Sequence, residues 1–203
     1  MSQENTITTY DLGVVMKALP IIWNDPERYN KHVILVGTFH FLRAYMKMLG
    51  EKMAGSGLSD ILLEAGLISG GSLTGVMSGK RYKHALHCHK TMLESLENLL
   101  FARFSRDQPL PQLDQDSLAK LEAAEKDPSM LTVEEALQDE GIKGLLNSYI
   151  QYWESGGLGK TAELWMAYMR HVRLMLTLLE AVKTNNFLLL QHYIYSNSKR
   201  NVI

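Results

Sequence analysis

Cysteine is almost absent from this 203-residue sequence, in which Cys88 is the single example. One cysteine excludes an internal disulfide, and such usage is typical of the reducing compartments of the cell. No apolar run approaches the roughly 18–20 residues that a membrane-spanning helix needs. The first residues, MSQENTITTYD, show neither the basic stretch nor the apolar core of a secretory signal. We therefore expect an intracellular protein, nuclear or cytoplasmic, with no membrane partner.

Acidic residues are missing from one long stretch, although the net charge of the whole chain is only −1. No Asp or Glu lies between Glu64 and Glu94. The same stretch contains four cations, which are Lys80, Arg81, Lys83 and Lys90. Between residues 107 and 140, in contrast, ten acidic side chains accompany two lysines, a balance of −8. Charge sorted in this way predicts a basic surface with a binding role or an acidic segment folded against it, and a solvated acidic insert is the alternative.

The first 57 residues have the pattern of a small α/β unit. Residues 6–10 (TITTY) are β-prone, and residues 32–39 (HVILVGTF) form a continuous apolar run, typical of a strand buried on both faces of a parallel sheet. Helical spacing of apolar side chains follows each strand, although Pro20 should end or kink the first helix. The second helix has an apolar stripe at Phe41, Leu42, Tyr45, Met46, Leu49 and Met53. We therefore predict a short parallel strand pair with helical connections.

Helical patterns dominate the rest of the chain, so we expect a mainly α protein in which a bundle-like remainder follows the α/β start. The expected helices are 58–67, 80–104, 117–126, 131–138, 142–153, 161–183 and 185–196. Ser59 is expected to cap the first of these, and Thr132 with Glu135 has the spacing of a capping box. We divide the chain into 1–105, an acidic linker or insert at 106–130, and a helical part at 131–203, packed as one globular unit.

The stretch GKRYKHALHCHK, residues 79–90, is the clearest candidate binding element. As a nucleic-acid surface, its Lys and Arg side chains would neutralise phosphates while its tyrosine stacks on a base. This interpretation assigns contacts to Lys80, Arg81, Tyr82, Lys83, His87 and Lys90. The alternative is an ordinary helix, in which Ala85, Leu86, Cys88, Met92 and Leu93 are buried while Arg81, Lys83, His84 and His87 lie toward water.

Two further motifs have simpler structural explanations. His84 and Cys88 have the types and spacing of two zinc ligands on one helix face, but a structural site needs four ligands and the chain has no second cysteine. GGLGKTAELW, residues 156–165, resembles a phosphate-binding loop, G-x-x-x-x-G-K-[ST]. Its first glycine position is occupied by Glu154, and an aromatic helix precedes it in place of a strand. We therefore reject nucleotide binding there and expect a helix connection with Thr161 as N-cap.

Asp11 and His40 directly follow the two expected strands. In open α/β sheets, ligands bind at the carboxyl ends of the strands. An Asp and a His placed there could hold a divalent metal or move protons in phosphodiester chemistry, with Glu64 as a third polar group. The alternative is that Asp11 and His40 only cap the helices that follow them. No cofactor is predicted beyond this divalent metal.

Four segments in order, TYDLGVVMKA, VILVGTFHFLRAYMKMLGEKMAGSGLSDILLEAGL, MSGKRYKHALHCHKTMLE and LWMAYMRHVRLMLTLLEAV, carry a family resemblance. The chain resembles an uncharacterised family of mobile-element-derived proteins of fishes and marine invertebrates, from about residue 10 to about residue 195. The most recognisable positions are Asp11, Gly37, Phe39, His40, Ser56, Gly57, Leu58, Gly79, Lys80, His89 and Trp165. The resemblance implies a longer protein, of which this chain is a fragment, and an origin in nucleic-acid processing.

We therefore expect a nucleic-acid-associated, transposase-like protein of unknown activity. One alternative is a non-catalytic helical interaction or scaffolding module, and another is a fragment of a metal-dependent phosphodiester-cleaving enzyme. The apolar segment FLLLQHYIY near the end would need a covering partner, so a homo-oligomer or a missing C-terminal segment is expected.

Overall fold

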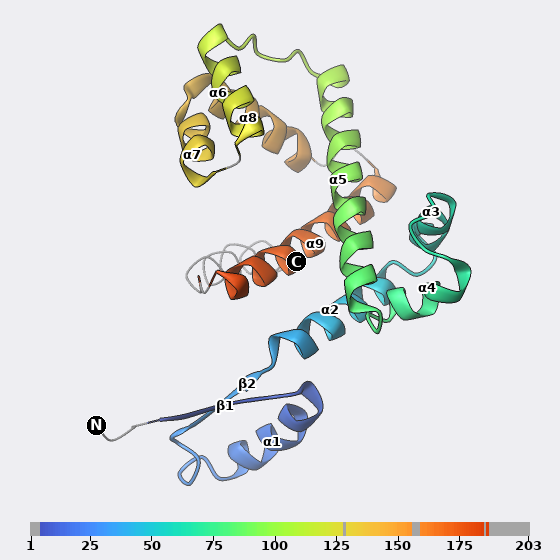
Figure 1. The fold of residues 1–203 in the computed structure, drawn as a ribbon, viewed down its shortest axis with the longest axis vertical. Coiled ribbons are helices and arrows are strands. Elements are labelled where there is room, and N and C mark those ends of the chain that lie inside the picture. The colour runs from blue at the N-terminus through green and yellow to red at the C-terminus, as the bar shows by residue number, and fades with distance from the viewer. Residues whose placement is uncertain (1–4, 128, 156–158, 185, 187–203) are drawn as a thin grey trace. The chain divides into compact units, whose positions relative to one another are not determined.

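The computed structural model describes residues 5–127, 129–155, 159–184 and 186 (Figure 1). The fold is mostly helical and begins with a short two-stranded parallel sheet, as the sequence predicts. Its described residues group into two compact units, one from Met1–Leu93 with Tyr168–Ile203 and one from Glu94–Ala167. The sequence-based division placed its boundaries elsewhere, near residues 105 and 130. None of the helices in the described part of the chain has the length and apolar character that crossing a bilayer requires.

The first unit starts with a β-α-β segment, which confirms the expected strand pair. Strand β1 (Thr6–Tyr10) pairs in parallel with β2 (His32–Val36), in a register that runs from Thr6 opposite His32 to Tyr10 opposite Val36. Helix α1 (Leu12–Asn24) connects the two strands. The second strand ends at Val36, three residues earlier than predicted, because helix α2 (Thr38–Lys52) begins almost at once.

The prediction that the second strand is buried on both faces is wrong. Leu35 is 48% exposed and Val33 is 41% exposed, and Ile7 on β1 is also exposed. The sheet has only two strands among the described residues, so it cannot enclose its apolar side chains as a wider, doubly covered sheet does. An apolar run alone does not distinguish these two situations.

Pro20 was expected to end or kink the first helix, but helix α1 continues through it. A proline removes the hydrogen bond to the carbonyl four residues earlier, here that of Met16. Both residues are exposed, so water can replace the lost donor. The helix ends four residues later, at Asn24, where the backbone N–H of Asp25 donates a hydrogen bond to the carbonyl of Ile22.

Two predicted N-caps are displaced. Helix α3 (Leu58–Glu64) is preceded by Gly57 at φ +89°, so Ser59 lies inside the helix. Helix α7 (Met130–Gln138) is capped by Ser129, whose hydroxyl accepts the N–H of Thr132. In both helices the capping residue comes earlier than predicted, because a glycine in the left-handed region and an earlier serine supply the turns.

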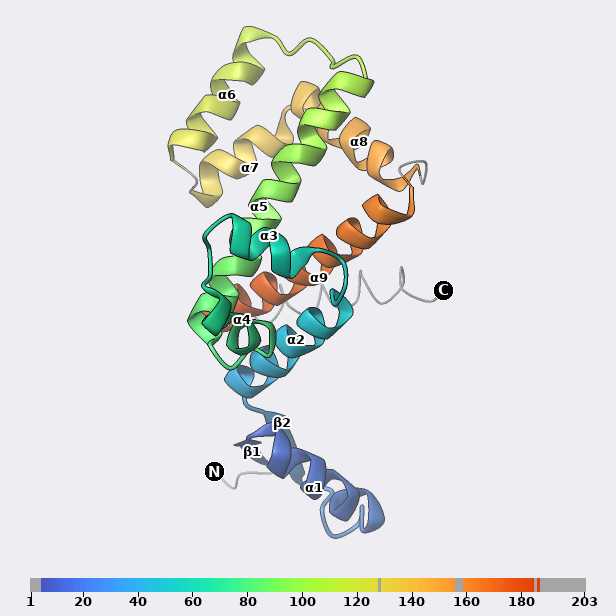
Figure 2. The same ribbon diagram turned by 90° about the vertical axis from the view of Figure 1, so that its right-hand side faces the viewer.

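The core of the first unit lies where α2, α3, α4 (Gly70–Met77), the first part of α5 (Tyr82–Asp107) and the last part of α9 (Lys160–Lys183) meet. Figure 2 shows α2, α4 and the start of α5 side by side. The stripe predicted on α2 is confirmed at Leu42, Met46, Leu49 and Met53, which are fully buried. Other fully buried members are Leu58, Leu62, Val76, Ala85, Cys88, Val172 and Met175. The helix predicted at 185–196 lies outside the described residues except for Asn186.

Two glycines allow the backbone after α4 to lie directly against α2. A Cβ on Gly50 would meet the carbonyl oxygen of Met77 at 2.2 Å. A Cβ on Gly79 would meet the carbonyl oxygen of Arg43 at 2.6 Å, and Gly79 also has φ +66°. Neither contact can be relieved by a side-chain rotation, because both partners are backbone atoms. The two glycines therefore determine how the turn that carries Lys80 lies beside α2.

Gly50→Ala should lower the free energy of unfolding by at least about 2 kcal/mol, since the added methyl group forces two backbone segments apart. Gly144→Ala is the matched control, because Gly144 is also inside a helix but has open space around its Cβ position. It should raise stability by roughly 0.5–1 kcal/mol through helix propensity alone. Urea denaturation followed by circular dichroism measures both values. A Gly50→Ala protein as stable as the parent would contradict the close packing.

The second unit contains the acidic part of the chain, folded as helices α6 (Gln115–Lys126), α7 and α8 (Glu140–Glu154). An aromatic cluster packs α8 against the second part of α5. Phe104 is fully buried, and its ring lies 5.3 Å from Tyr149 and 5.5 Å from Tyr152. The hydroxyl of Tyr152 donates to the carboxylate of Asp107 at 2.9 Å.

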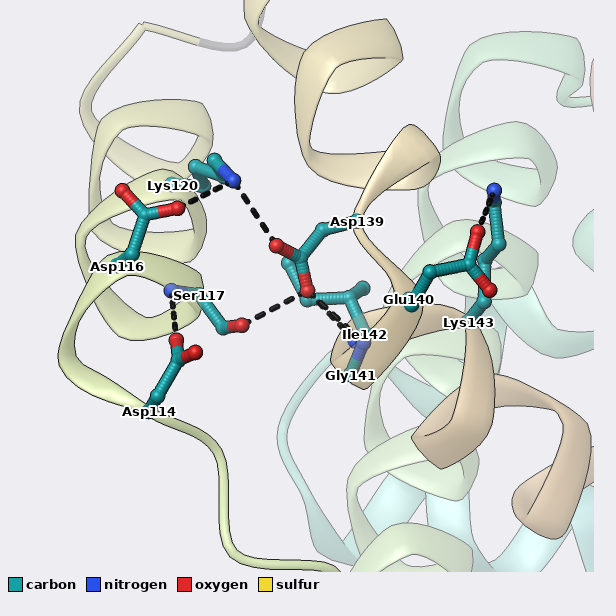
Figure 3. Close-up of polar contacts among 9 residues, drawn as sticks. All are labelled: Asp114, Asp116, Ser117, Lys120, Asp139, Glu140, Gly141, Ile142 and Lys143. Atoms are coloured by element: carbon teal, nitrogen blue, oxygen red, sulfur yellow. Dashed lines mark hydrogen bonds and ion pairs between the residues drawn. The ribbon is translucent and has the colours of Figure 1, made fainter.

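Asp139 joins the starts of two acidic helices (Figure 3). Its carboxylate accepts the N–H groups of Gly141 and Ile142, at 3.0 and 3.1 Å, and so caps α8. The same carboxylate accepts from the Ser117 hydroxyl at 2.7 Å and from the Lys120 ammonium at 2.9 Å, both on α6. These hydrogen bonds, from Lys120 foremost, hold the pKa of Asp139 well below its usual range.

Asp139→Ala should lower the melting temperature by roughly 2–6 °C, because it removes the cap of α8 and the tie to α6 together. Asp116→Ala is the control, since Asp116 also pairs with Lys120 but is exposed and caps no helix. We expect it to change the melting temperature little. Equal losses in the two variants, measured by calorimetry, would show that the pairing with Lys120, and not the cap, matters.

Candidate functional site

The basic stretch 79–90 forms a turn and the first part of α5, and its side chains divide between water and the core. Its exposed members are Lys80, Arg81, Lys83, His84, His87 and Lys90. Ala85, Cys88 and His89 are fully buried. Lys83, His87 and Lys90 follow one another at spacings of four and three residues, so they lie on one side of the helix. The acid-free stretch therefore presents most of its cations to solvent, while its apolar side packs.

Three cations of this stretch have no ionic partner among the described carboxylates. Lys80, Arg81 and Lys83 form no ion pair with any described residue. The guanidinium of Arg81 instead donates to the Ser72 hydroxyl of α4 at 2.7 Å. In the 107–140 region, Asp107 pairs with Arg103 and Arg106, and Lys120 pairs with Asp116 and Asp139.

Tyr82, the residue expected to stack on a base, packs against another aromatic ring of the protein. It is half-buried, and its ring centroid lies 5.1 Å from that of Phe39 at the start of α2. Burial raises the pKa of its hydroxyl. Tyr82 therefore has a packing role against Phe39, whatever further contacts it makes.

A cavity of about 410 Å³ lies at the carboxyl ends of β1 and β2, beside Lys80. Its charged lining is basic, with Arg43 and Lys47 on α2 and Lys80 on the turn after α4. The other lining residues are Leu12 and Gly13 of the first turn of α1, with His40, Ala44 and Ser78. None of these lining residues carries a carboxylate. The cavity therefore lies at the edge of the sheet where the sequence predicted a ligand site, and its charged lining is basic.

The three residues proposed as a catalytic group have separate positions. Asp11 caps α1, accepting the N–H of Val14 at 2.9 Å, which was the structural alternative. His40 is the third residue of α2, whose N-cap is Gly37, and it lines the basic cavity without capping the helix. Glu64 is exposed at the end of α3.

No group of three or more His, Cys, Asp or Glu side chains that could hold a metal ion exists within the described ranges. The structure therefore does not gather Asp11, His40 and Glu64 around one ion. The same holds for His84 and Cys88, of which the first is exposed and the second is buried. Burial raises the pKa of the Cys88 thiol, so it is a packing residue with little thiolate character. At the other rejected motif, α9 begins at Lys160, so Thr161 is inside the helix and is not its cap.

His89 and Tyr168 form a buried polar pair that the sequence analysis did not predict. The Nδ1 atom of His89 lies 2.8 Å from the Tyr168 hydroxyl, and Nε2 is buried without a hydrogen-bond partner. Burial lowers the pKa of His89 to about 4. His89 follows Ala85 by four residues and precedes Met92 by three, so helical spacing from those apolar positions could have identified it.

A second polar group that the sequence did not indicate lies between α2 and α9. His171 contacts the Tyr45 hydroxyl through Nδ1 at 2.9 Å and the Lys52 ammonium through Nε2 at 2.8 Å. Burial first, and then the charges of Lys52 and Arg170, lower the pKa of His171. Because an ammonium can only donate, Nε2 accepts and Nδ1 carries the ring proton. Tyr45 also borders an apolar cavity of about 480 Å³ between β2, α2 and α9.

His89 should make the stability of the protein depend on pH. Its pKa is lower in the folded state than in the unfolded state, so the free energy of unfolding is highest above about pH 6.5 and falls as the pH is lowered toward 4. The contribution has a maximum slope of about 1.4 kcal/mol per pH unit. His89→Gln should reduce this slope in urea denaturation at several pH values. His87→Gln, which removes an exposed imidazole from the same helix, should leave the slope as it is.

Comparison with known proteins identifies a family but no activity. A family model described as "Domain of unknown function (DUF8702)" matches residues 1–196. No curated protein and no solved structure matches the chain.

Proposed function

We propose that this chain, which belongs to the family described as a domain of unknown function (DUF8702), binds nucleic acid through the exposed cations of residues 80–90. One observation carries the proposal. Lys80, Arg81 and Lys83 are exposed, and none of them is neutralised by a described carboxylate. Proteins keep such unneutralised cations together where a polyanion is the partner. The resemblance to mobile-element-derived proteins also favours nucleic acid as the partner.

The geometry of the basic stretch suits the backbone of a nucleic acid more than its bases. Lys83 and Lys90 are seven residues apart on α5, a distance of about 10 Å along the helix axis. This length covers about three nucleotides of one strand at about 3.4 Å each. Tyr82 is packed against Phe39, and the remaining contacts are charged. We therefore expect phosphate contacts and weak sequence preference.

Phosphate binding releases counterions, so the affinity should fall steeply with salt. A labelled 20-nucleotide single strand and the matching duplex, titrated between about 50 and 200 mM NaCl, measure this dependence by fluorescence anisotropy. Lys83→Gln combined with Lys90→Gln should reduce the slope of log K against log [salt] by about 1.4–1.8. Lys126→Gln combined with Lys143→Gln removes the same charge from the second unit and should leave the slope unchanged. Absence of binding, or an affinity independent of salt, would overturn the proposal.

A further inference from the structure

We propose that the basic cavity beside Lys80 binds a phosphate monoester, and that its source is the terminal phosphate of a nucleic-acid strand. The assignment of the strand end rests on the proposed function, whereas the phosphate site itself does not. The observations are the unpaired cations of the cavity, the free N–H groups of α1, and the position of Lys80 between the cavity and α5.

Arg43 is the central cation of the cavity. Its guanidinium lies 5.7 Å from the Phe39 ring centroid, and its Nε is buried without a hydrogen-bond partner in the described part of the chain. A buried charged donor without an acceptor is costly, and native proteins keep few of them. Lys47 pairs with Glu51 at 3.5 Å on the exposed rim, whereas Lys80 has no carboxylate partner among the described residues. Both side chains line the cavity, so an anion held there would accept charge-assisted hydrogen bonds from the Arg43 guanidinium and the Lys80 ammonium.

The first turn of α1 adds backbone donors to the same cavity. The Asp11 carboxylate accepts the N–H of Val14, and the Asp11 backbone carbonyl accepts the N–H of Val15. The N–H groups of Leu12 and Gly13, which line the cavity, bond to no acceptor within residues 5–127 or the other described ranges. A helix start carries a partial positive charge and is a common position for phosphate groups. The carboxyl ends of parallel strands are the matching position in α/β sheets.

The charges favour a monoester over an internal phosphodiester. Arg43 and Lys80 supply two positive charges that form no ion pair with a described carboxylate, whereas the partial charge of the helix start is already met by the Asp11 cap. A phosphate monoester carries about −1.5 to −2 at pH 7, whereas a diester carries −1. The volume of about 410 Å³ admits a phosphate with its attached sugar. Lys80 borders the cavity and directly precedes α5, so a strand held by its end would continue onto Lys83 and His87.

The test compares two 12-nucleotide single strands that differ only in a 5′-phosphate or 5′-hydroxyl, titrated by fluorescence anisotropy at constant salt. We expect the phosphorylated strand to bind about tenfold more tightly, the effect of one or two charge-assisted hydrogen bonds. Arg43→Gln and Lys80→Gln should each abolish the advantage of the phosphate. Lys83→Gln should weaken both strands equally. Because Arg43 is partly buried, circular dichroism checks that its variant folds, and the exposed Lys80 tests the same site independently.

A second measurement separates this inference from the proposed function. Inorganic phosphate and adenosine 5′-monophosphate are titrated into isotope-labelled protein, and the amide resonances of Leu12 and Gly13 are followed. Shifts at these amides without binding of either strand would support the phosphate site and overturn nucleic acid as its source. Equal affinity for both strands without such shifts would overturn the site and leave the proposed function in place. A 3′-phosphorylated strand then shows which end is bound.

Discussion

The close approach of two backbones is the constraint on which the first unit depends. Gly50 and Gly79 let the end of α4 and the following turn lie against α2 at distances that no side chain would allow. Because of that contact, Lys80 comes to lie beside Arg43 and Lys47 of α2. The same turn leads into α5, whose buried residues Ala85 and Cys88 complete the core. Packing and charge presentation therefore arise from the same short stretch of chain.

The acid-free stretch illustrates how one helix serves two purposes. Its apolar side is buried. The same side includes His89, whose imidazole contacts the Tyr168 hydroxyl and has a pKa lowered by burial. Beside it, Lys80, Arg81 and Lys83 are exposed and form no ion pair with a described carboxylate.

Much of the fold follows from local patterns, and what does not follow depends on contacts between distant segments. The strand pair, the α2 stripe and most helices were predictable because apolar periodicity and capping residues act within a few positions of the chain. The burial of β2 was not, because an apolar run does not reveal how many strands or helices cover it. Arg43 and Lys47 were not recognised as site residues, since they join Lys80 only through the α2–α4 contact. Asp11 and His40 follow the two strands as expected, and the grouping of both with Glu64 around one ion could not be judged from the sequence, because it depends on where α3 lies.

Asp139 gives the acidic unit a property that its separate helices would not have. One carboxylate holds the start of α8 and two side chains of α6, and α7 lies between them in the chain. Opening either helix end therefore releases hydrogen bonds at the other. Short helices joined in this way lose their structure together, so amide hydrogen exchange in α6 and in the first turn of α8 should proceed through a common opening event.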